Sequence, residues 1–307
     1  MSARKNIIPI FVPHWGCPHN CVFCNQNRIT GEKKPATAED VKRAIAGADS
    51  ENAQVAFYGG SFTAIPASQQ EELLEAASGY SIRLSTRPDC IDDAVLKRLE
   101  KYGVDTIELG AQSLDNEVLR LAGRGHTAED VENASKLIKS AGFNLILQMM
   151  TGLPGDTEEK DIETAKKIIA LKPDGARIYP TVIVKDTALF EFWKKGLYKE
   201  HTVEDAVEVC SKLLPLFDEA RIPVIRLGLN PTDELSGGDA IAGAYHSALG
   251  ELVKSRIKRN ELEEKVRAGS REFSIPANLF SQYTGQHRCN ILYFKEKYGA
   301  DIKFIPQ

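Results

Sequence analysis

The sequence predicts an α/β protein, a partial (β/α)6-type TIM barrel followed by a small C-terminal α/β cap. From residue 7 to about 227, short β-branched runs alternate with amphipathic helical patterns, the order that builds a parallel sheet with right-handed crossovers. The runs are mostly apolar throughout, as expected of strands that are buried on both faces. Unusual motifs follow the strands, and parallel α/β barrels carry their active sites at that end.

Seven runs are predicted strands, and six segments between them are predicted helices. We expect the strands at 7–13, 54–59, 82–86, 106–110, 143–150, 176–180 and 222–227, and the helices at 37–48, 68–78, 92–102, 127–141, 156–171 and 202–220. Thr37 and Thr127 each begin the sequence Thr-Ala-Glu-Asp, a capping-box pattern typical of helix N-termini. We expect the barrel to occupy 1–230 and the cap, with an amphipathic helix and a final strand, to occupy 231–307.

The composition indicates a globular protein without a membrane span. Of its 307 residues 42% are apolar and its net charge is −4, which is ordinary for a soluble domain with a sizeable core. No stretch approaches the roughly 18 uncharged apolar residues that spanning needs. The N-terminal residues lack the long apolar region and cleavage site of a signal peptide. We therefore expect a cytoplasmic protein with no membrane contact; the oligomeric state is not indicated.

Charge is unevenly distributed along the chain. Residues 251–307 contain 11 basic and 7 acidic residues, a net charge of +4, whereas the preceding residues carry −8. A mildly basic C-terminal region permits contact with RNA but does not require it. A solvated helix face of mixed charge is the simpler interpretation of this pattern.

Three of the six cysteines lie on one short segment, Cys17-Pro-His-Asn-Cys21-Val-Phe-Cys24. A disulfide framework in a secreted chain would look different, so this cluster indicates metal or redox chemistry. Three thiolates on one loop are suited to hold three irons of a [4Fe–4S] cluster, which leaves one iron open to another ligand. From the loop alone, a zinc site completed by His14 or His19 is the alternative.

This cysteine pattern, with Phe23 before the last cysteine, resembles the signature of the radical S-adenosylmethionine (SAM) superfamily. The resemblance implies that Cys17, Cys21 and Cys24 bind a [4Fe–4S] cluster and that SAM is the second cofactor. It also implies a low-potential electron donor of the flavodoxin or ferredoxin type as a partner.

Later motifs agree with this resemblance in order and spacing. Gly59-Gly60-Ser61 resembles the glycine motif whose backbone meets the amino group of SAM. Gly152-Leu153-Pro154-Gly155 resembles the loop beside the adenine. Glycine suits such positions because it allows a close approach of the backbone.

Polar residues at further strand ends are expected to complete the SAM site. The residues predicted to bind the SAM carboxylate and ribose are Ser85, Arg87, Gln112 and Ser113. Arg124 is a candidate carboxylate partner because a guanidinium forks onto carboxylates; a structural salt bridge is the alternative for it. Tyr179 is expected to face either the substrate or the core. No catalytic residue is assigned.

A closer resemblance links the chain to the radical SAM domain of the elongator catalytic subunit, whose family modifies the wobble uridine of tRNA. Segments 110–127, 141–155 and 176–199 carry this resemblance, which covers about residues 7 to 230. There are two departures from the family. The elongator subunit spaces its first two cluster cysteines further apart, and the roughly 80 residues after the barrel here are too few for its acetyltransferase domain. Its carboxymethylation chemistry is therefore not carried over.

The sequence thus predicts a radical SAM enzyme that cleaves SAM reductively to a 5′-deoxyadenosyl radical, which abstracts hydrogen from a nucleoside in tRNA or another RNA. Two alternatives stay open. A radical SAM enzyme acting on a small metabolite or peptide is favoured by the acidic body of the chain. A non-catalytic Fe–S or zinc protein that binds RNA would show no SAM cleavage under reduction.

Overall fold

The structure is a computed structural model that describes residues 6–12, 14–32, 34–48, 52–233 and 235–307. Its centre is a sheet of seven parallel strands in the order β1-β2-β3-β4-β5-β6-β8. The strands are β1 (Asn6–Phe11), β2 (Ala53–Tyr58), β3 (Ser81–Thr86), β4 (Val104–Gln112), β5 (Asn144–Thr151), β6 (Gly175–Pro180) and β8 (Val224–Leu227). All seven predicted strands are present; residue 13, the expected end of the first, lies outside the described residues.

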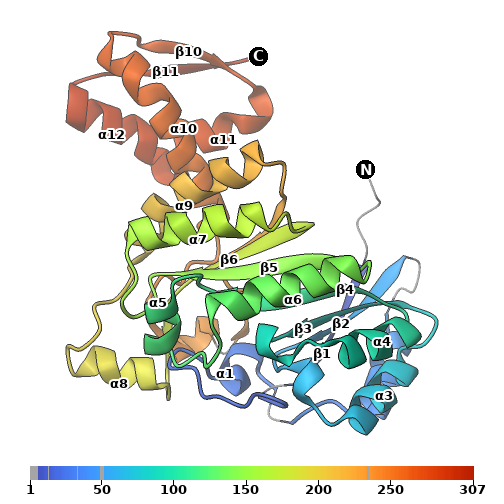
Figure 1. Ribbon diagram of the computed structural model, residues 1–307. Coiled ribbons are helices and arrows are strands. Elements are labelled where there is room, and N and C mark those ends of the chain that lie inside the picture. Colours follow the sequence, from blue (N-terminus) through green and yellow to red (C-terminus); the bar gives the residue numbers. More distant parts are fainter. Residues whose placement is uncertain (1–5, 13, 33, 49–51, 234) are drawn as a thin grey trace.

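Helices cover the outer face of this sheet, and Figure 1 shows α6 and α7 lying along the strands. The predicted helices are observed as α2 (Ala38–Ala46), α3 (Ala67–Ala76), α4 (Asp93–Lys101), α6 (Ala128–Ser140), α7 (Glu158–Ala170) and α9 (Val203–Glu219). The capping boxes predicted at Thr37 and Thr127 are both formed, and Thr202 forms a third. The partial α/β barrel is therefore confirmed. Among the described helices, none has the length and apolar character needed to cross a bilayer.

Several short elements were not predicted. They are α1 (Gln26–Thr30), α5 (Asn116–Leu121), α8 (Ala188–Lys194), the antiparallel pair β7 (Val182–Val184) and β9 (Ala240–Gly243), a π-helical turn (Leu235–Asp239) and 3-10 turns at Phe62–Ala64, Pro88–Cys90, Ala277–Leu279 and Gln286–Arg288. One contact connects two of these elements, which lie far apart in the sequence. Arg28 on α1 pairs with Asp239 at 2.9 Å and also with Asp186.

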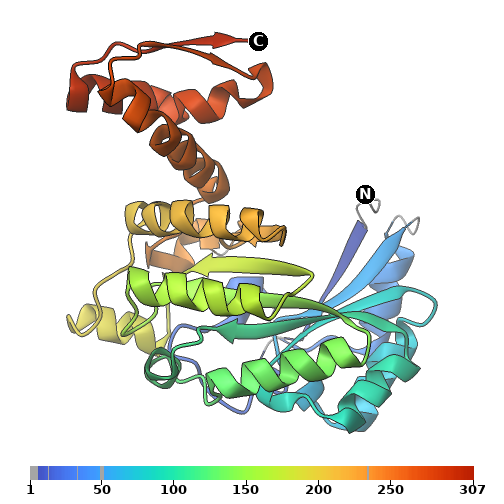
Figure 2. The same ribbon diagram turned by 45° about the horizontal axis from the view of Figure 1, so that its top comes forward.

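The C-terminal residues form a small α/β unit with a core of its own. The long helix α10 (Leu249–Arg267) leads into β10 (Glu272–Ile275), α11 (Phe280–Thr284), α12 (Cys289–Tyr298) and β11 (Lys303–Pro306), and β10 pairs with β11 in parallel. Figures 1 and 2 show this unit standing apart from the sheet, connected through α10. The barrel core includes Ala244, Leu249 and Val253, so residues on both sides of the boundary expected at 230 share it. That boundary stays a prediction.

Candidate functional site

A cavity of about 600 Å³ lies on the inner side of the sheet. It is lined by residues from all seven strands and from residues 14–24, the cysteine loop. The predicted site residues that line it are Cys17, Cys21, Cys24, Gly59, Gly60, Ser85, Arg87, Gln112 and Arg124. Motifs that follow the first four strands therefore meet at one place, because parallel strands bring their carboxyl ends to the same edge of a sheet.

The cysteine loop follows β1 and packs directly on the glycine motif that follows β2. A Cβ atom on Gly60 would lie 2.3 Å from the carbonyl oxygen of Val12 and 2.5 Å from that of Trp15. A Cβ on Gly16, whose φ is +73°, would lie 2.3 Å from the carbonyl oxygen of Ser61. The backbone N–H of Ser61 donates to the Trp15 carbonyl at 3.0 Å. Only glycine fits at these two contacts, which fix the loop against the sheet.

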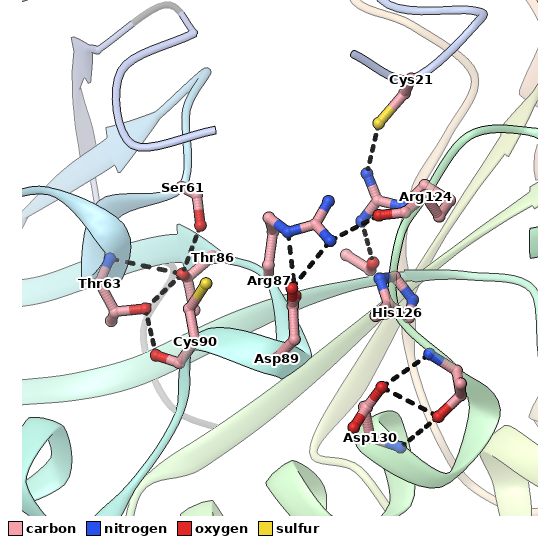
Figure 3. Close-up of polar contacts among 12 residues, drawn as sticks. Cys21, Ser61, Thr63, Thr86, Arg87, Asp89, Cys90, Arg124, His126 and Asp130 are labelled. Carbon is pink, nitrogen blue, oxygen red and sulfur yellow. Dashed lines mark hydrogen bonds and ion pairs between the residues drawn. The ribbon is translucent and has the colours of Figure 1, made fainter. Parts of the chain in front are cut away.

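The segment 123–125 supports the cysteine loop from another element. Arg124 donates through Nη1 to the Cys21 sulfur at 3.2 Å and through Nη2 to the Gly110 carbonyl at 2.6 Å (Figure 3). Gly125, with a φ of +72°, leaves room for the His19 ring, which would lie 2.4 Å from a Cβ atom there. Arg124 therefore connects the loop to the end of β4, and its predicted contact with the SAM carboxylate stays a prediction.

Arg87, at the end of β3, supports Arg124 in turn. Its guanidinium pairs with Asp89 at 2.9 Å and donates to the Arg124 carbonyl, as Figure 3 shows. The Arg87 side chain is only 5% exposed. Because a buried guanidinium stays charged, it needs these acceptors. Arg87 thus holds the rim of the cavity in place as well as lining it.

The three thiols are free and face the same cavity. Burial raises the pKa of Cys24 to about 12, and the neighbouring Cys21 adds to the effect. Burial and Cys21 also raise the pKa of Cys17, while Arg87 and Arg124 act in the opposite direction. Iron binds thiolates, so loading must release these protons, and the two guanidinium groups favour the charged form that results.

The donor set suits a [4Fe–4S] cluster with one open iron. Arg124 Nε is buried with no partner in the described part of the chain. Over the described ranges, no three His, Cys, Asp or Glu side chains already surround a metal position.

The zinc alternative needed His14 or His19 as a fourth ligand. His14 Nε2 instead accepts from the backbone N–H of Gln26 at 2.9 Å, which fixes the start of α1. Cluster binding by the three cysteines stays a prediction.

The hydroxyl groups of two residues predicted to bind SAM form hydrogen bonds within the protein. Ser61 is fully buried, and its hydroxyl lies 3.1 Å from that of Thr86. The Ser113 hydroxyl lies 3.3 Å from the hydroxyl of Thr164 on α7, and its oxygen accepts from the backbone N–H of Asp115. Both hydroxyl groups therefore stabilise the strand ends around the cavity. The backbone contact predicted for Gly59-Gly60-Ser61 and the contact predicted for Ser113 stay predictions.

The predicted adenine loop also lies outside the cavity lining. Gly152 borders a separate pocket of about 240 Å³, and Leu153 packs with Val118 and Ala122. Pro154 borders neither of these two pockets. The contacts predicted for residues 152–154 stay predictions.

Several polar residues on the inner face of the sheet were not predicted as site residues. Glu108 on β4 is 2% exposed, and its Oε1 accepts from Arg83 and from Arg177, each at 2.9 Å. Burial raises the pKa of Tyr58 to about 12, with Glu108 as a second cause. Burial opposes the charge on Arg177. Glu108, Tyr179 and Tyr58 outweigh this effect and hold the pKa of the guanidinium above its usual range. The sequence signal that could have identified Glu108 and Arg177 was a charged residue within a largely apolar strand.

Comparison with known proteins identifies the family of the chain. Residues 12–168 match the family described as the Radical SAM superfamily, and residues 173–259 match its C-terminal domain. The chain therefore belongs to the radical SAM superfamily, a class of enzymes that use a [4Fe–4S] cluster with SAM and need a reductant.

Among its curated relatives, the chain is similar to the tRNA uridine(34) acetyltransferase of Methanocaldococcus infernus. The two are 37% identical over 183 residues, or 58% of this chain and 33% of that protein. Human Elongator complex protein 3 is 34% identical over 181 residues, or 58% of this chain and 32% of that protein. The chain thus spans about a third of the length of these relatives.

Solved structures show the same fold. The Methanocaldococcus infernus Elp3 structure with an N-terminal deletion gives a TM-score of 0.65 at 23% identity, covering 91% of this chain and 67% of that one. Coproporphyrinogen III oxidase (HemN) from Escherichia coli gives 0.54 at 17% identity, covering 71% and 53%.

Proposed function

We propose that this enzyme modifies a uridine in tRNA by radical chemistry. The observation that carries the proposal is one cavity that gathers three cysteines, a glycine motif and a polar strand face. It lies in a chain up to 37% identical to a protein named tRNA uridine(34) acetyltransferase. Acetyl transfer is not part of the proposal, because the similarity covers only a third of that relative.

The residues of the cavity have distinct roles in this proposal. Cys17, Cys21 and Cys24 would hold the cluster, which when bound would supply the electron that splits SAM into methionine and a 5′-deoxyadenosyl radical able to abstract a substrate hydrogen. Gly59 and Gly60 would let the backbone approach SAM, and Arg124 would hold Cys21 in position. The inner face of the sheet would bind the uridine and exclude water and stray hydrogen donors.

The first test is SAM cleavage by the anaerobically reconstituted protein under dithionite. We expect 5′-deoxyadenosine, measured by chromatography, to increase when a tRNA transcript with uridine at position 34 is added. A transcript with cytidine there is the matched control, and mass spectrometry of the digested RNA would identify a new nucleoside. Cys21→Ala should abolish both signals, whereas Cys289→Ala, which changes an exposed cysteine in the C-terminal unit, should not.

Each alternative gives a different result in this assay. Cleavage that is indifferent to tRNA, with RNA left unchanged, would favour a small metabolite or peptide as substrate. Absence of cleavage by a protein carrying about four irons per chain, with tRNA present, would contradict the enzyme proposal and favour a binding protein.

A further inference from the structure

The cavity carries an excess of positive charge. Its charged lining residues are one carboxylate, Glu108, and four arginines, Arg87, Arg124, Arg177 and Arg226. Arginine keeps its charge at any pH that the protein tolerates. Since charges removed from bulk water need partners, such a cavity favours negatively charged ligands.

Two of the four arginines are matched near the cysteine loop. Arg87 pairs with Asp89, and Arg124 donates to the Cys21 sulfur, which becomes negative when it binds iron. The unmatched positive charge in the cavity therefore belongs to Arg177 and Arg226.

Arg177 and Arg226 are neighbours on the two adjacent strands β6 and β8. They are paired in register, so their side chains leave the sheet on the same face. Glu108 faces Arg177 but also serves Arg83, so one carboxylate is shared between two guanidinium groups. Arg226 donates through Nε to the Gly228 carbonyl at 3.1 Å. In the described part of the chain, its two terminal nitrogens have no hydrogen-bond partner and no acid.

Tyr179 adds a donor beside these arginines. Its hydroxyl oxygen accepts from Arg177 Nη1 at 3.1 Å, which leaves its proton free for a ligand. Arg177 is itself held by Glu108 at 2.9 Å and by the Tyr58 hydroxyl at 3.1 Å. Its Nε and the second oxygen of Glu108 are buried without a partner among the described residues. Donors held in this way bind an acceptor at a low entropic cost.

We propose that Arg226, Arg177 and the Tyr179 hydroxyl form a subsite for an oxyanion of the substrate, a phosphate or a carboxylate. Two guanidinium groups and a hydroxyl match the several acceptor atoms of such a group. The identity of the nucleoside rests on the proposed function, and in that case the oxyanion is a phosphate of the target nucleotide. The proposal of an oxyanion subsite depends only on the charge balance of the cavity.

The test measures binding without turnover. Reconstituted, unreduced protein is titrated in a low-salt buffer free of phosphate and sulfate, with binding followed by calorimetry. Uridine, uridine 5′-monophosphate and uridine-5′-carboxylate form a matched series that differs only in the charged group, and pyrophosphate serves as a probe without a nucleoside. We expect at least one charged uridine compound to bind about tenfold more tightly than uridine or better.

The variants assign this advantage to the subsite. Arg226→Gln should remove most of the tighter binding of the charged compound relative to uridine. Arg226→Lys should restore part of this difference, and Tyr179→Phe should reduce it a few-fold. Arg43→Gln, which changes an exposed arginine on α2, is the matched control and should leave it intact. Circular dichroism would confirm that each variant is folded, and Arg226 is not in the buried core, so its replacement is compatible with folding.

The outcomes separate this subsite from the proposed function. Tighter binding of the monophosphate identifies a phosphate, and tighter binding of the carboxylate identifies a carboxylate; both support the subsite. Binding of pyrophosphate that depends on Arg226, with no preference for the uridine compounds, supports the subsite and contradicts the nucleoside. An advantage that survives Arg226→Gln, or no advantage together with pyrophosphate binding independent of Arg226, overturns the subsite.

Discussion

Gly60 is the residue at which the cysteine loop and the end of β2 touch. Gly60→Ala would place a Cβ within 2.5 Å of two backbone oxygens, and because backbone cannot move aside cheaply, we expect a cost of about 1–3 kcal/mol. The cysteine loop should shift, so iron retained after reconstitution should fall. Iron per chain and urea unfolding measure the two effects.

Gly47→Ala is the control for this prediction. A Cβ on Gly47 at the end of α2 would lie 3.5 Å from the carbonyl oxygen of Arg43, which is ordinary van der Waals contact, and the φ of Gly47 is −86°. This variant should keep both its stability and its iron. Full iron retention by Gly60→Ala would show that the loop does not depend on the contact.

Asp161 is buried and Asp156 is partly buried, and both line the pocket of about 240 Å³ that Gly152 borders. Burial raises the pKa of Asp156 to about 6, and burial together with the Asp156 charge holds the pKa of Asp161 well above its usual range. The folded state therefore keeps protons that the unfolded state loses, and stability falls as the pH rises from about 4 through about 6. Asp161→Asn, which stays neutral, should gain about 1–3 kcal/mol on the wild type between pH 4 and 7.

Asp205 lines the same pocket as Asp156 and Asp161. It provides a control, because its effect on stability should change with pH in the opposite direction. Hydrogen bonds from Thr202 lower the pKa of its carboxyl. Its contribution is therefore present above its unfolded pKa and is lost as the pH falls. Asp205→Asn should be less stable than the wild type at pH 7, and the difference should shrink in acid. Urea unfolding across this pH range measures both variants, and parallel pH trends would contradict the assignment.

At the scale of elements, the N-terminus of α6 affects the site through the segment before it. Thr127→Ala removes a capping box, which costs about 1 kcal/mol, directly after the residues that support the cysteine loop. We expect faster hydrogen exchange at 121–127 and lower iron retention. Thr37→Ala removes the capping box of α2 and should cost similar stability while leaving the iron content unchanged.

In the barrel, element prediction succeeded where the pattern was long enough. In the C-terminal unit, the 19-residue helix α10 and the strand β10 were not predicted. Seven strands and six helices were predicted because apolar periodicity and capping residues extend over whole elements. The elements missed include α5, α8, β7 and β9, which have 6, 7, 3 and 4 residues. These are too short for a period to be recognised, and their contacts with distant segments hold them in place.

At the scale of the molecule, the two cores predict separate responses to mutation. Phe294 is fully buried in the C-terminal core, and Phe294→Ala should cost that unit about 3–5 kcal/mol. Hydrogen exchange should then rise across 272–306 while β2 to β5 stay protected. Leu84→Ala, in the barrel core, should give the reverse pattern. Equal loss of protection in both units would show that they unfold together.

Periodicity, capping and short motifs are local properties of the chain, so the strand–helix alternation, the cysteine loop and the superfamily could be predicted from the sequence. Which polar side chains face the cavity depends on how distant segments pack together. Glu108, Arg177 and Arg226 line one cavity because β4, β6 and β8 belong to the same sheet, in the order β4-β5-β6-β8, and inward positions alternate along each strand. The register shift between Gly110 and Gln112, where Gln112 has a φ of +67°, re-aims the chain there. Gln112 consequently lines the cavity and Ser113 does not, a choice that no local pattern encodes.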